Sequence, residues 1–234
     1  MQYSNPFIEL CLEGPSSVFK GLTPEEKETL DKHHTLVSFE KTSLIAGEGS
    51  RTRGLMCLAS GKAKVFSTGV GNREQIIKML RPQNFINYRA LYSDTPHPFS
   101  VAAIEKSSVV IFEKHTLSGI LRQNSDLVIR FLKIISEDLM FTDSRLMSLT
   151  QKHVRGRVAE SVLLLRDTYG LETDEQTLRV LLTREDFAHL SNMTTSNAIR
   201  TLSNLVAEGI LAIEGRKISI LDTDKLLEIS RSGQ

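Results

Sequence analysis

The stretch LTREDFAHLSNMTTSNAIRTLSNLVAEGILAI, residues Leu182–Ile213, predicts two short helices joined by a tight turn. Thr183 is a good N-cap for the first helix, and the acidic residues that follow in its first turn suit the helix dipole. The segment Ser191–Thr194 then breaks this helix, and within it Asn192 tolerates the left-handed conformation that a sharp turn requires. Because the connection is so short, we expect the two helices to pack closely together.

The second helix has one apolar face and ends at a glycine. Thr194 or Thr195 can cap its N-terminus, and Gly209 marks its end. Its apolar residues fall at positions i, i+4, i+7 and i+8, which is the spacing of a single stripe along a helix. We expect the stripe to face the core; it consists of Ala198, Leu202, Leu205 and Val206.

The opposite face of the second helix carries short hydrogen-bonding side chains and one forked donor. Such side chains suit the reading of base edges in the major groove of DNA. The alternative is an ordinary pair of helices with a polar face toward solvent, but such a face would normally hold more Glu and Lys. We therefore favour a DNA-reading helix, with contacts from Thr195, Ser196, Asn197 and Arg200.

Length and composition are those of an ordinary soluble protein. The chain has 234 residues, 24% of them charged, with a formal net charge of +1, and this length suffices for two modest domains. No stretch approaches the roughly 18 consecutive apolar residues of a membrane span, and the N-terminus lacks the pattern of a signal peptide. We expect a cytoplasmic protein without a membrane partner, and the bulk charge by itself does not indicate nucleic acid.

Cysteine and histidine usage limits the cofactors. Cys11 and Cys57 are the two cysteines, which excludes a Cys-rich zinc site and a four-thiolate iron–sulfur cluster within one chain. A disulfide between them stays open, as does a redox role, although no secretory signal supports an oxidising compartment. The histidines show no HxH or HxxxH spacing, so we predict no metal site.

The N-terminal half has the texture of a β-roll or jelly roll. From about Val37 to Glu113, short β-branched runs alternate with glycines and turn residues. A helix begins after Thr23, because Thr, Pro and two acids follow one another there, and a second covers His115–Arg122. The expected strands are Leu55–Leu58, Ala63–Phe66, Gln75–Leu80, Val101–Ile104 and Val109–Phe112.

A long helix follows the roll and carries a regular apolar seam. Asn124 opens a capping cluster, and the sequence contains no further helix breaker before Gly156. Steps of four and three over three heptads are typical of a coiled-coil interface, so we favour a parallel homodimer over a helix that lies wholly against its own domain. The seam consists of Val128, Leu132, Ile135, Leu139, Thr142, Leu146 and Leu149.

The flanks of the opening stretch predict the rest of a winged helix-turn-helix. A strand is expected at Leu178–Leu182, directly before the first helix. After Gly209, the segments Ile210–Ile213 and Ile218–Leu221 form a hairpin, the wing, and Thr223–Ile229 forms a last short helix.

In this order of parts, with the motifs RGRVAESVLLL, LTREDFAHL and GRKISIL, the chain resembles the cAMP receptor protein/FNR family of bacterial transcription regulators. The resemblance spans nearly the whole chain. It implies an α+β protein: a cyclic-nucleotide-binding-like β-roll over residues 1–123, a dimerisation helix and hinge over 124–152, and a winged helix-turn-helix over 153–234. It also implies a homodimer on palindromic double-stranded DNA that works with RNA polymerase.

The family's base-reading stretch falls on the start of the predicted recognition helix. Arg200 matches the last arginine of that stretch and is expected to read guanine, whereas Ser196 replaces the usual glutamate. The preferred half-site should therefore differ from the common family sequence. Phosphate contacts are expected from Arg184, Lys217, Lys152 and Arg155.

The family's ligand pocket departs from the pattern of cAMP-binding members. Where those carry a ribose acceptor and a phosphate-binding arginine, this chain has Asn87-Tyr88-Arg89 and Pro98-Phe99-Ser100. Burying a cyclic phosphate without a cation is costly, so cAMP is not expected. Arg89 could bind an anion or form an ion pair, and we favour the ion pair. A pocket for an unidentified effector would involve Tyr88, Arg89, Phe99, Ser100 and Thr142.

Haem and an iron–sulfur cluster have no supporting spacing either, and no catalytic motif indicates an enzyme. The alternative reading, a cupin-like metalloenzyme with a C-terminal partner-binding module, lacks a histidine ligand pattern. One observation weighs against easy DNA binding: from Lys152 onward, the chain has eleven basic and twelve acidic residues. The basic side chains must therefore cluster on one face to neutralise phosphates.

Overall fold

The computed structural model describes residues 3–52 and 54–233 and contains two compact units. The first comprises Met1–Ser67 and Leu80–Leu139, and the second comprises Thr68–Met79 and Met140–Gln234. Each unit buries its own set of apolar side chains.

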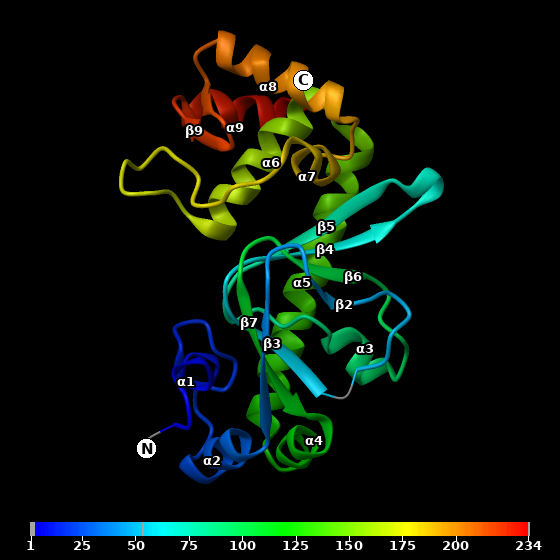
Figure 1. The fold of residues 1–234 in the computed structure, drawn as a ribbon, viewed down its shortest axis with the longest axis vertical. Helices are drawn as coiled ribbons and strands as arrows, with labels where there is room; N and C mark the ends of the chain where they lie inside the picture. The colour runs from blue at the N-terminus through cyan, green and yellow to red at the C-terminus, as the bar shows by residue number, and fades with distance from the viewer. Residues whose placement is uncertain (1–2, 53, 234) are drawn as a thin grey trace. The chain divides into compact units, whose positions relative to one another are not determined.

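The roll is built from two antiparallel sheets (Figure 1). One sheet has the order β1-β7-β3, with strands His34–Phe39, Ser107–Glu113 and Gly54–Ser60. The other has the order β2-β6-β4-β5, with strands Leu44–Ala46, Ser100–Ala103, Ala63–Thr68 and Glu74–Leu80. All five strands that the sequence predicted are confirmed, whereas β1 and β2 were not predicted as separate strands. β1 has no fully buried residue and β2 is only three residues long, so the pattern there is weak.

Four short helices cover this unit: α1 (Pro6–Glu13), α2 (Pro24–Lys32), α3 (Tyr88–Ser93) and α4 (Lys114–Gln123). The helix predicted after Thr23 is confirmed as α2, where Thr23 and Glu26 form a complete capping box. The predicted helix at His115–Arg122 is α4. The sequence analysis missed α1, although the Asn5 side chain caps it and accepts from two backbone amides, and it missed α3, which no side chain caps.

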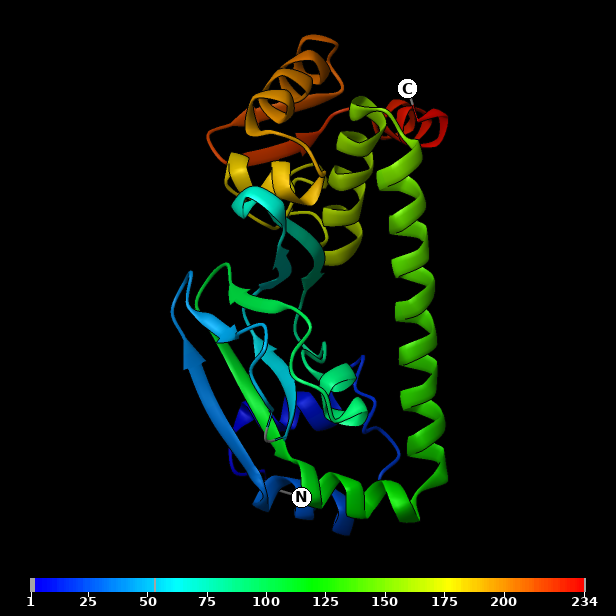
Figure 2. The ribbon, with the colours of Figure 1, turned by 90° about the vertical axis from the view of Figure 1, so that its right-hand side faces the viewer.

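Aromatic rings hold the core of the first unit together. Phe19 lies with its ring centroid 5.0 Å from that of Phe112 and contacts Phe85 and Phe131 edge-on. Phe131 comes from the long helix α5 (Ser125–Gln151), so the first turns of that helix belong to the core. Figure 2 shows α4 and α5 meeting at a sharp corner, where the Asn124 side chain accepts from the Leu127 amide at 2.9 Å.

The long helix ends earlier than its sequence suggested. The expectation of an unbroken helix as far as Gly156 is wrong, because α5 ends at Gln151 and α6 (Val154–Tyr169) begins after His153. The backbone N–H of His153 donates to the carbonyl of Gly233 at 2.8 Å instead of continuing the helix. Gly156 lies inside α6, where an added Cβ would stand 2.8 Å from Gly233, so this glycine permits close packing rather than ending a helix.

The second unit contains the helix-turn-helix and its hairpin (Figure 1). Besides α6 it has α7 (Arg184–Leu190), α8 (Thr195–Ala207), β8 (Leu211–Glu214), β9 (Lys217–Ile220) and α9 (Thr223–Ser232), which confirms the two helices, the wing and the last helix. The strand predicted at Leu178–Leu182 is wrong. The chain there makes only isolated bridges, with Leu178 bridging to Leu171, because most of this segment finds no partner strand.

The apolar stripe of α8 is confirmed in three of its four residues. Ala198, Leu202 and Leu205 are buried, but Val206 is 38% exposed. Each helical residue turns by about 100°, which puts Val206 about 80° from Ala198 and at the edge of the buried face. Thr201 is buried on the other side of the stripe, at 8% exposed, so the buried face of α8 is rotated toward Thr201 relative to the predicted stripe.

We predict that Phe187→Ala destabilises the second unit by about 3–5 kcal/mol, because Phe187 is 1% exposed and its removal leaves a cavity under α7. Urea unfolding followed by circular dichroism measures the change. Ile199→Ala, at a position 45% exposed on α8, is the matched control and should alter stability by no more than about 0.5 kcal/mol. Equal losses in the two variants would contradict the core assignment.

Candidate nucleic-acid interface

The helix-turn-helix is fixed by two caps and one left-handed residue. The Thr183 side chain accepts from the Asp186 amide at 2.9 Å at the start of α7, and the Thr194 side chain accepts from the Asn197 amide at 3.3 Å at the start of α8. Asn192 has a φ of 50°, as the sequence predicted for the turn. Of the two candidate caps of α8, Thr194 is therefore the one used.

A second set of contacts, which are buried, stabilises the turn from the interior of the unit. The Ser191 hydroxyl donates to the Ser161 hydroxyl of α6 at 2.9 Å, and both serines are completely buried. Met193 is also buried, as expected for an apolar residue that fills the turn. The sequence did not indicate the serine pair, because only the packing of α6 against the turn brings the two residues together.

The outward face of α8 carries the predicted base-reading side chains. Ser196 and Arg200 are exposed, and Thr195 and Asn197 are half-buried. The Arg200 guanidinium donates to the Asn197 side-chain oxygen at 3.0 Å, so its fork is held above the helix surface. One exposed face of the helix thus presents a forked donor, an amide and two hydroxyls, which is the chemistry needed for base edges.

The predicted phosphate contacts fall into two groups. Lys217 is exposed on β9, and Arg184 donates to the Gly215 carbonyl of the wing turn at 2.7 Å, which ties α7 to the hairpin. Lys152 and Arg155 instead already contact carboxylates: Lys152 lies 2.9 Å from Glu160, and Arg155 binds Glu208 through both of its terminal nitrogens.

The bidentate pair has an electrostatic consequence. The hydrogen bonds from Arg155 lower the pKa of Glu208, so this carboxylate stays ionised at neutral pH. Arg155 must exchange Glu208 for a phosphate if it is to contact DNA.

The seam of α5 is largely open to solvent in the single chain. Val128, Leu132, Ile135, Leu139 and Leu146 are exposed, and Thr142 and Leu149 are half-buried. Three further exposed apolar side chains, which the sequence analysis did not include, accompany them on the same helix: Ile129, Met140 and Met147. Large apolar side chains gathered in this way indicate a surface that another protein covers.

The residues predicted for an effector pocket have other partners. Tyr88 is buried and its hydroxyl donates to the Asp138 carboxylate, while the Arg89 guanidinium lies 2.7 Å from the same carboxylate. Burial, followed by the hydrogen bond to Asp138, raises the pKa of Tyr88 to about 12. The ion pair favoured for Arg89 is thus confirmed, but it is not the surface pair that was expected, because its partner Asp138 is buried. No local pattern in the sequence indicated Asp138.

The other predicted pocket residues lie elsewhere. The Ser100 side chain, at the start of β6, accepts from the Glu48 amide at 3.1 Å, with Phe99 beside it in sequence. Thr142 belongs to the second unit, whereas the other four residues belong to the first. Asn87, which the sequence placed next to Tyr88, is buried and pins α3 to β3 by accepting from the Met56 amide at 2.8 Å and donating to the Gly54 carbonyl.

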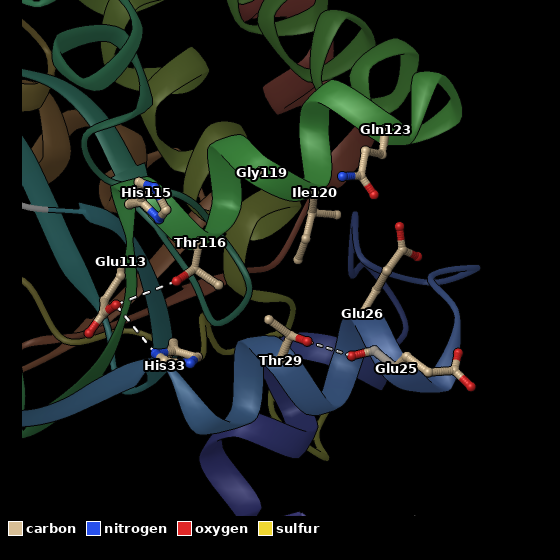
Figure 3. A pocket seen from close by; sticks show the side chains of 10 residues that line it. All are labelled: Glu25, Glu26, Thr29, His33, Glu113, His115, Thr116, Gly119, Ile120 and Gln123. Carbon is tan, nitrogen blue, oxygen red and sulfur yellow. Dashed lines mark hydrogen bonds and ion pairs between the residues drawn. The ribbon is translucent and has the colours of Figure 1, made fainter.

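Two cavities are lined by different residues. A groove of about 570 Å³ lies between α2 and α4 (Figure 3), where His33 Nδ1 stands 3.5 Å from Glu113 Oε2. Its lining consists of Glu25, Glu26, Thr29, His33, Glu113, His115, Thr116, Gly119, Ile120 and Gln123. A smaller cavity of about 280 Å³ in the second unit lies beside Arg145 and Glu160. Within residues 3–52 and 54–233, no group of three or more His, Cys, Asp or Glu could hold a metal ion.

The cysteines form a buried pair of thiols. Cys11 and Cys57 are both free and buried, so the disulfide left open by the sequence is not formed. The hydrogen bond to Cys11 and the burial of the site raise the pKa of the Cys57 thiol, which makes it a poor nucleophile. Across the described part of the chain, no helix is long and apolar enough to cross a membrane.

Comparisons with known proteins agree with this architecture in both halves of the chain. Residues 36–124 match the cyclic nucleotide-binding domain, and residues 156–229 match the Crp-like helix-turn-helix domain. A CRP-like cAMP-activated global transcriptional regulator of Mycobacterium tuberculosis is 23% identical over 92% of this chain and 97% of its own length. An anaerobic regulatory protein of Bacillus subtilis is 23% identical over 85% of each chain.

Solved structures show the same fold. FixK2 from Bradyrhizobium japonicum superposes with a TM-score of 0.75 at 21% identity, covering 84% of this chain and 96% of that one. The c-di-GMP-responsive regulator CLP of Xanthomonas campestris superposes with a TM-score of 0.73 at 16% identity, covering 85% of this chain and 99% of that one. The α+β class, with an N-terminal roll, a long helix and a C-terminal winged helix-turn-helix, is thus confirmed.

We predict an asymmetry between the two partners of the buried ion pair. Arg89→Met should destabilise the first unit by about 2–3 kcal/mol, because it removes a charge-assisted hydrogen bond from a carboxylate that is 6% exposed. Asp138→Asn should cost less, since the Arg89 side chain can turn to water from a position 43% exposed. Thermal unfolding of the two variants measures the difference, and a larger loss for Asp138→Asn would contradict this account.

Proposed function

The chain belongs to the CRP/FNR family of bacterial transcription regulators, and we propose that it acts as a homodimer that reads a palindromic site on double-stranded DNA. The observation that carries this proposal is the outward face of α8, where Arg200 and Asn197 are joined in an exposed pair beside Ser196. This face stands between a capped tight turn and a β-hairpin, the arrangement of a recognition helix with its wing.

Base reading would centre on Arg200. Its fork can donate to O6 and N7 of guanine, and each such bidentate contact gives about 1–3 kcal/mol of discrimination against a wrong base. Ser196 is too short to act as the family's usual glutamate does, so cytosine would not be read in the same way. Thr195 and Asn197 complete the surface that faces the groove, and the half-site is expected to differ from the common family sequence.

Phosphate binding would rest on two cations outside α8, the exposed Lys217 and the half-buried Arg184. Lys217 on the wing and Arg184 at the start of α7 are placed for it, since Arg184 keeps further donors beyond the one given to Gly215. Lys152 and Arg155 would take part only by leaving Glu160 and Glu208. With a nearly neutral C-terminal half, affinity should depend on these few side chains.

The seam of α5 supports dimerisation. Apolar side chains at steps of four and three, such as Leu132, Leu139 and Leu146, are exposed in the single chain, and a second α5 would cover them. Thr142, the polar member of the seam, would help to fix the register. Two recognition helices related by this axis would reach half-sites about one helical turn apart.

The roll would sense a signal other than cAMP. Around Tyr88 and Arg89 the chain supplies its own anion, the Asp138 carboxylate, so a cyclic phosphate would have to compete with it. A small-molecule effector of another kind would reposition the recognition helices, and contact with RNA polymerase is proposed from the family alone. We place the protein in the cytoplasm, where its DNA would be. The cupin-like enzyme reading finds no metal-binding cluster within the described residues.

The direct experiment is selection of bound sequences from random DNA by the purified protein, repeated with and without candidate effectors. A palindrome with half-sites about one turn apart would support the proposal. Recovery of no common motif under any condition would contradict it.

We predict that two substitutions separate base reading from phosphate binding. Arg200→Ala should remove discrimination at one base pair of each half-site, a loss of about 1–3 kcal/mol per half-site. Lys217→Ala should weaken binding to all sequences almost equally and lower the slope of log affinity against log salt by about 1. Fluorescence anisotropy over a salt series measures both effects. The same specificity profile for Arg200→Ala and the unmodified protein would contradict the assignment.

We also predict that Leu139→Lys gives monomers, because it puts a charge at the centre of the apolar seam, where Leu139 is 59% exposed in the single chain. Glu137→Lys is the matched control, on the same helix but outside the seam, where Glu137 pairs with Lys133. Analytical ultracentrifugation distinguishes the two. A dimer unaffected by Leu139→Lys would show that the chains associate through a different surface.

A further inference from the structure

The C-terminal end of α7 and the turn after it are held by side chains from outside the helix-turn-helix. The last carbonyls of a helix have no partner within it, so donors placed there stabilise its end. Three such donors are present: Gln75 Nε2 to the His189 carbonyl at 2.8 Å, Arg145 Nη2 to the Leu190 carbonyl at 2.7 Å, and Arg157 Nη1 to the Asn192 carbonyl at 2.7 Å.

Each donor comes from a different element of the second unit. Arg145 lies near the C-terminal end of α5, and Arg157 lies in the first turn of α6. Gln75 lies on β5, in the segment Thr68–Met79 that clusters with this unit. The neighbouring Glu74 carboxylate stands 3.6 Å from His189 Nδ1, so the same segment meets α7 through two adjacent side chains.

These contacts carry an electrostatic cost. Arg145 is only 7% exposed, and burial lowers the pKa of its guanidinium and that of Arg157. The Nε atoms of both arginines are buried without a hydrogen-bond partner. An apolar side chain would avoid this penalty, so the two arginines are poorly explained as simple packing. The two arginines are therefore better explained by the carbonyls that they hold in position.

The carbonyls lie directly before the recognition helix. Leu190 is the last residue of α7, Asn192 is the left-handed residue of the turn, and Thr194 caps α8 two residues later. The backbone between Leu190 and Thr194 is constrained, because the Met193 amide donates back to the Ala188 carbonyl at 3.0 Å. Any shift of these carbonyls would therefore move the start of α8 and the face that carries Arg200.

We propose that Arg145 and Arg157 are positioning residues that fix the recognition helix to α5 and α6, with Gln75 as a third and weaker holding contact. Since α5 also carries the seam, Arg145 ties the position of α8 to the axis of the dimer. The two arginines then set the half-site separation that the dimer accepts, although neither arginine contacts DNA. This inference rests on the proposed function, and it concerns the spacing of half-sites rather than the sequence that each half-site contains.

The test uses the full-length dimer and the palindrome recovered by selection, with the two half-sites moved one base pair closer together or further apart. The unmodified protein should prefer the natural spacing strongly. Arg145→Met and Arg157→Met should lose this preference by roughly fivefold or more, the size of a typical coupling between two sites. Arg145→Lys keeps one charged donor for the Leu190 carbonyl and should restore part of the preference.

Two controls separate positioning from general damage. Arg130→Met removes an arginine of the same helix whose Nε donates to the Asp126 carbonyl of its own helix at 3.2 Å, and it should leave the spacing preference unchanged. Hydrogen exchange at the Met193 amide should quicken in Arg145→Met and Arg157→Met, while exchange in the buried middle of α6 stays slow. A variant that merely lost stability would quicken both and would keep its spacing preference in the fraction that folds.

The outcomes are distinct from those of the proposed function. If the unmodified protein recovers no motif, DNA reading itself is wrong, whatever the arginine variants do. If it binds a palindrome while Arg145→Met and Arg157→Met keep the spacing profile of Arg130→Met, the positioning inference is overturned. If Arg145→Met does not fold, Arg145→Lys and Arg157→Met decide in the same way, because a normal spacing profile in both overturns it.

Discussion

The tight turn between α7 and α8 is the constraint on which the functional surface depends. Asn192 takes a left-handed backbone conformation, and the Thr183 and Thr194 caps define where the two helices begin. A turn this short leaves the direction of α8 no freedom of its own, so whatever holds the turn also directs Arg200. The buried Ser161–Ser191 hydrogen bond, the buried Arg145 and the half-buried Arg157 hold it from inside the unit. The reading face is thus rigid because of polar contacts that the face itself does not contain.

The cations of the C-terminal half also fall into two groups, those bound to other groups of the protein and those that are exposed. Basic and acidic residues are nearly equal in number there, but the basic side chains differ in what they contact. Arg145 and Arg157 bind carbonyls, and Lys152 and Arg155 bind carboxylates, whereas Arg200 and Lys217 are exposed. A balanced domain can still present cations on one face, because several of its other cations are neutralised or buried. Net charge was therefore a poor guide to this surface.

Around α3 of the roll, too, a cation is paired with a carboxylate of the same chain. In the segment where the sequence resemblance suggested a ligand pocket, Tyr88 and Arg89 converge on Asp138, a carboxylate from the long helix. Burial of that carboxylate demands a cation and hydrogen bonds, and the chain provides both. The consequence is a direct polar link between α3 and α5 within one unit. The same helix carries the proposed dimer seam, so this link connects α3 to that surface.

The sequence by itself determined the local elements: the capped helices, the five predicted strands of the roll, the wing, the seam of α5 and the polar face of α8. Caps, periodicity and left-handed turn residues are local, so a single sequence is enough to read them. It failed where a distant partner decides. The break at His153 depends on the Gly233 carbonyl, Gly156 packs against Gly233 at the end of α9 instead of ending a helix, and only Leu178 of the segment Leu178–Leu182 forms a β-bridge. Only the tertiary structure showed that Asp138 neutralises Arg89 and that Arg145 and Arg157 hold the turn. Hydrogen bonds between residues 35 to 49 positions apart leave no periodic trace in the chain.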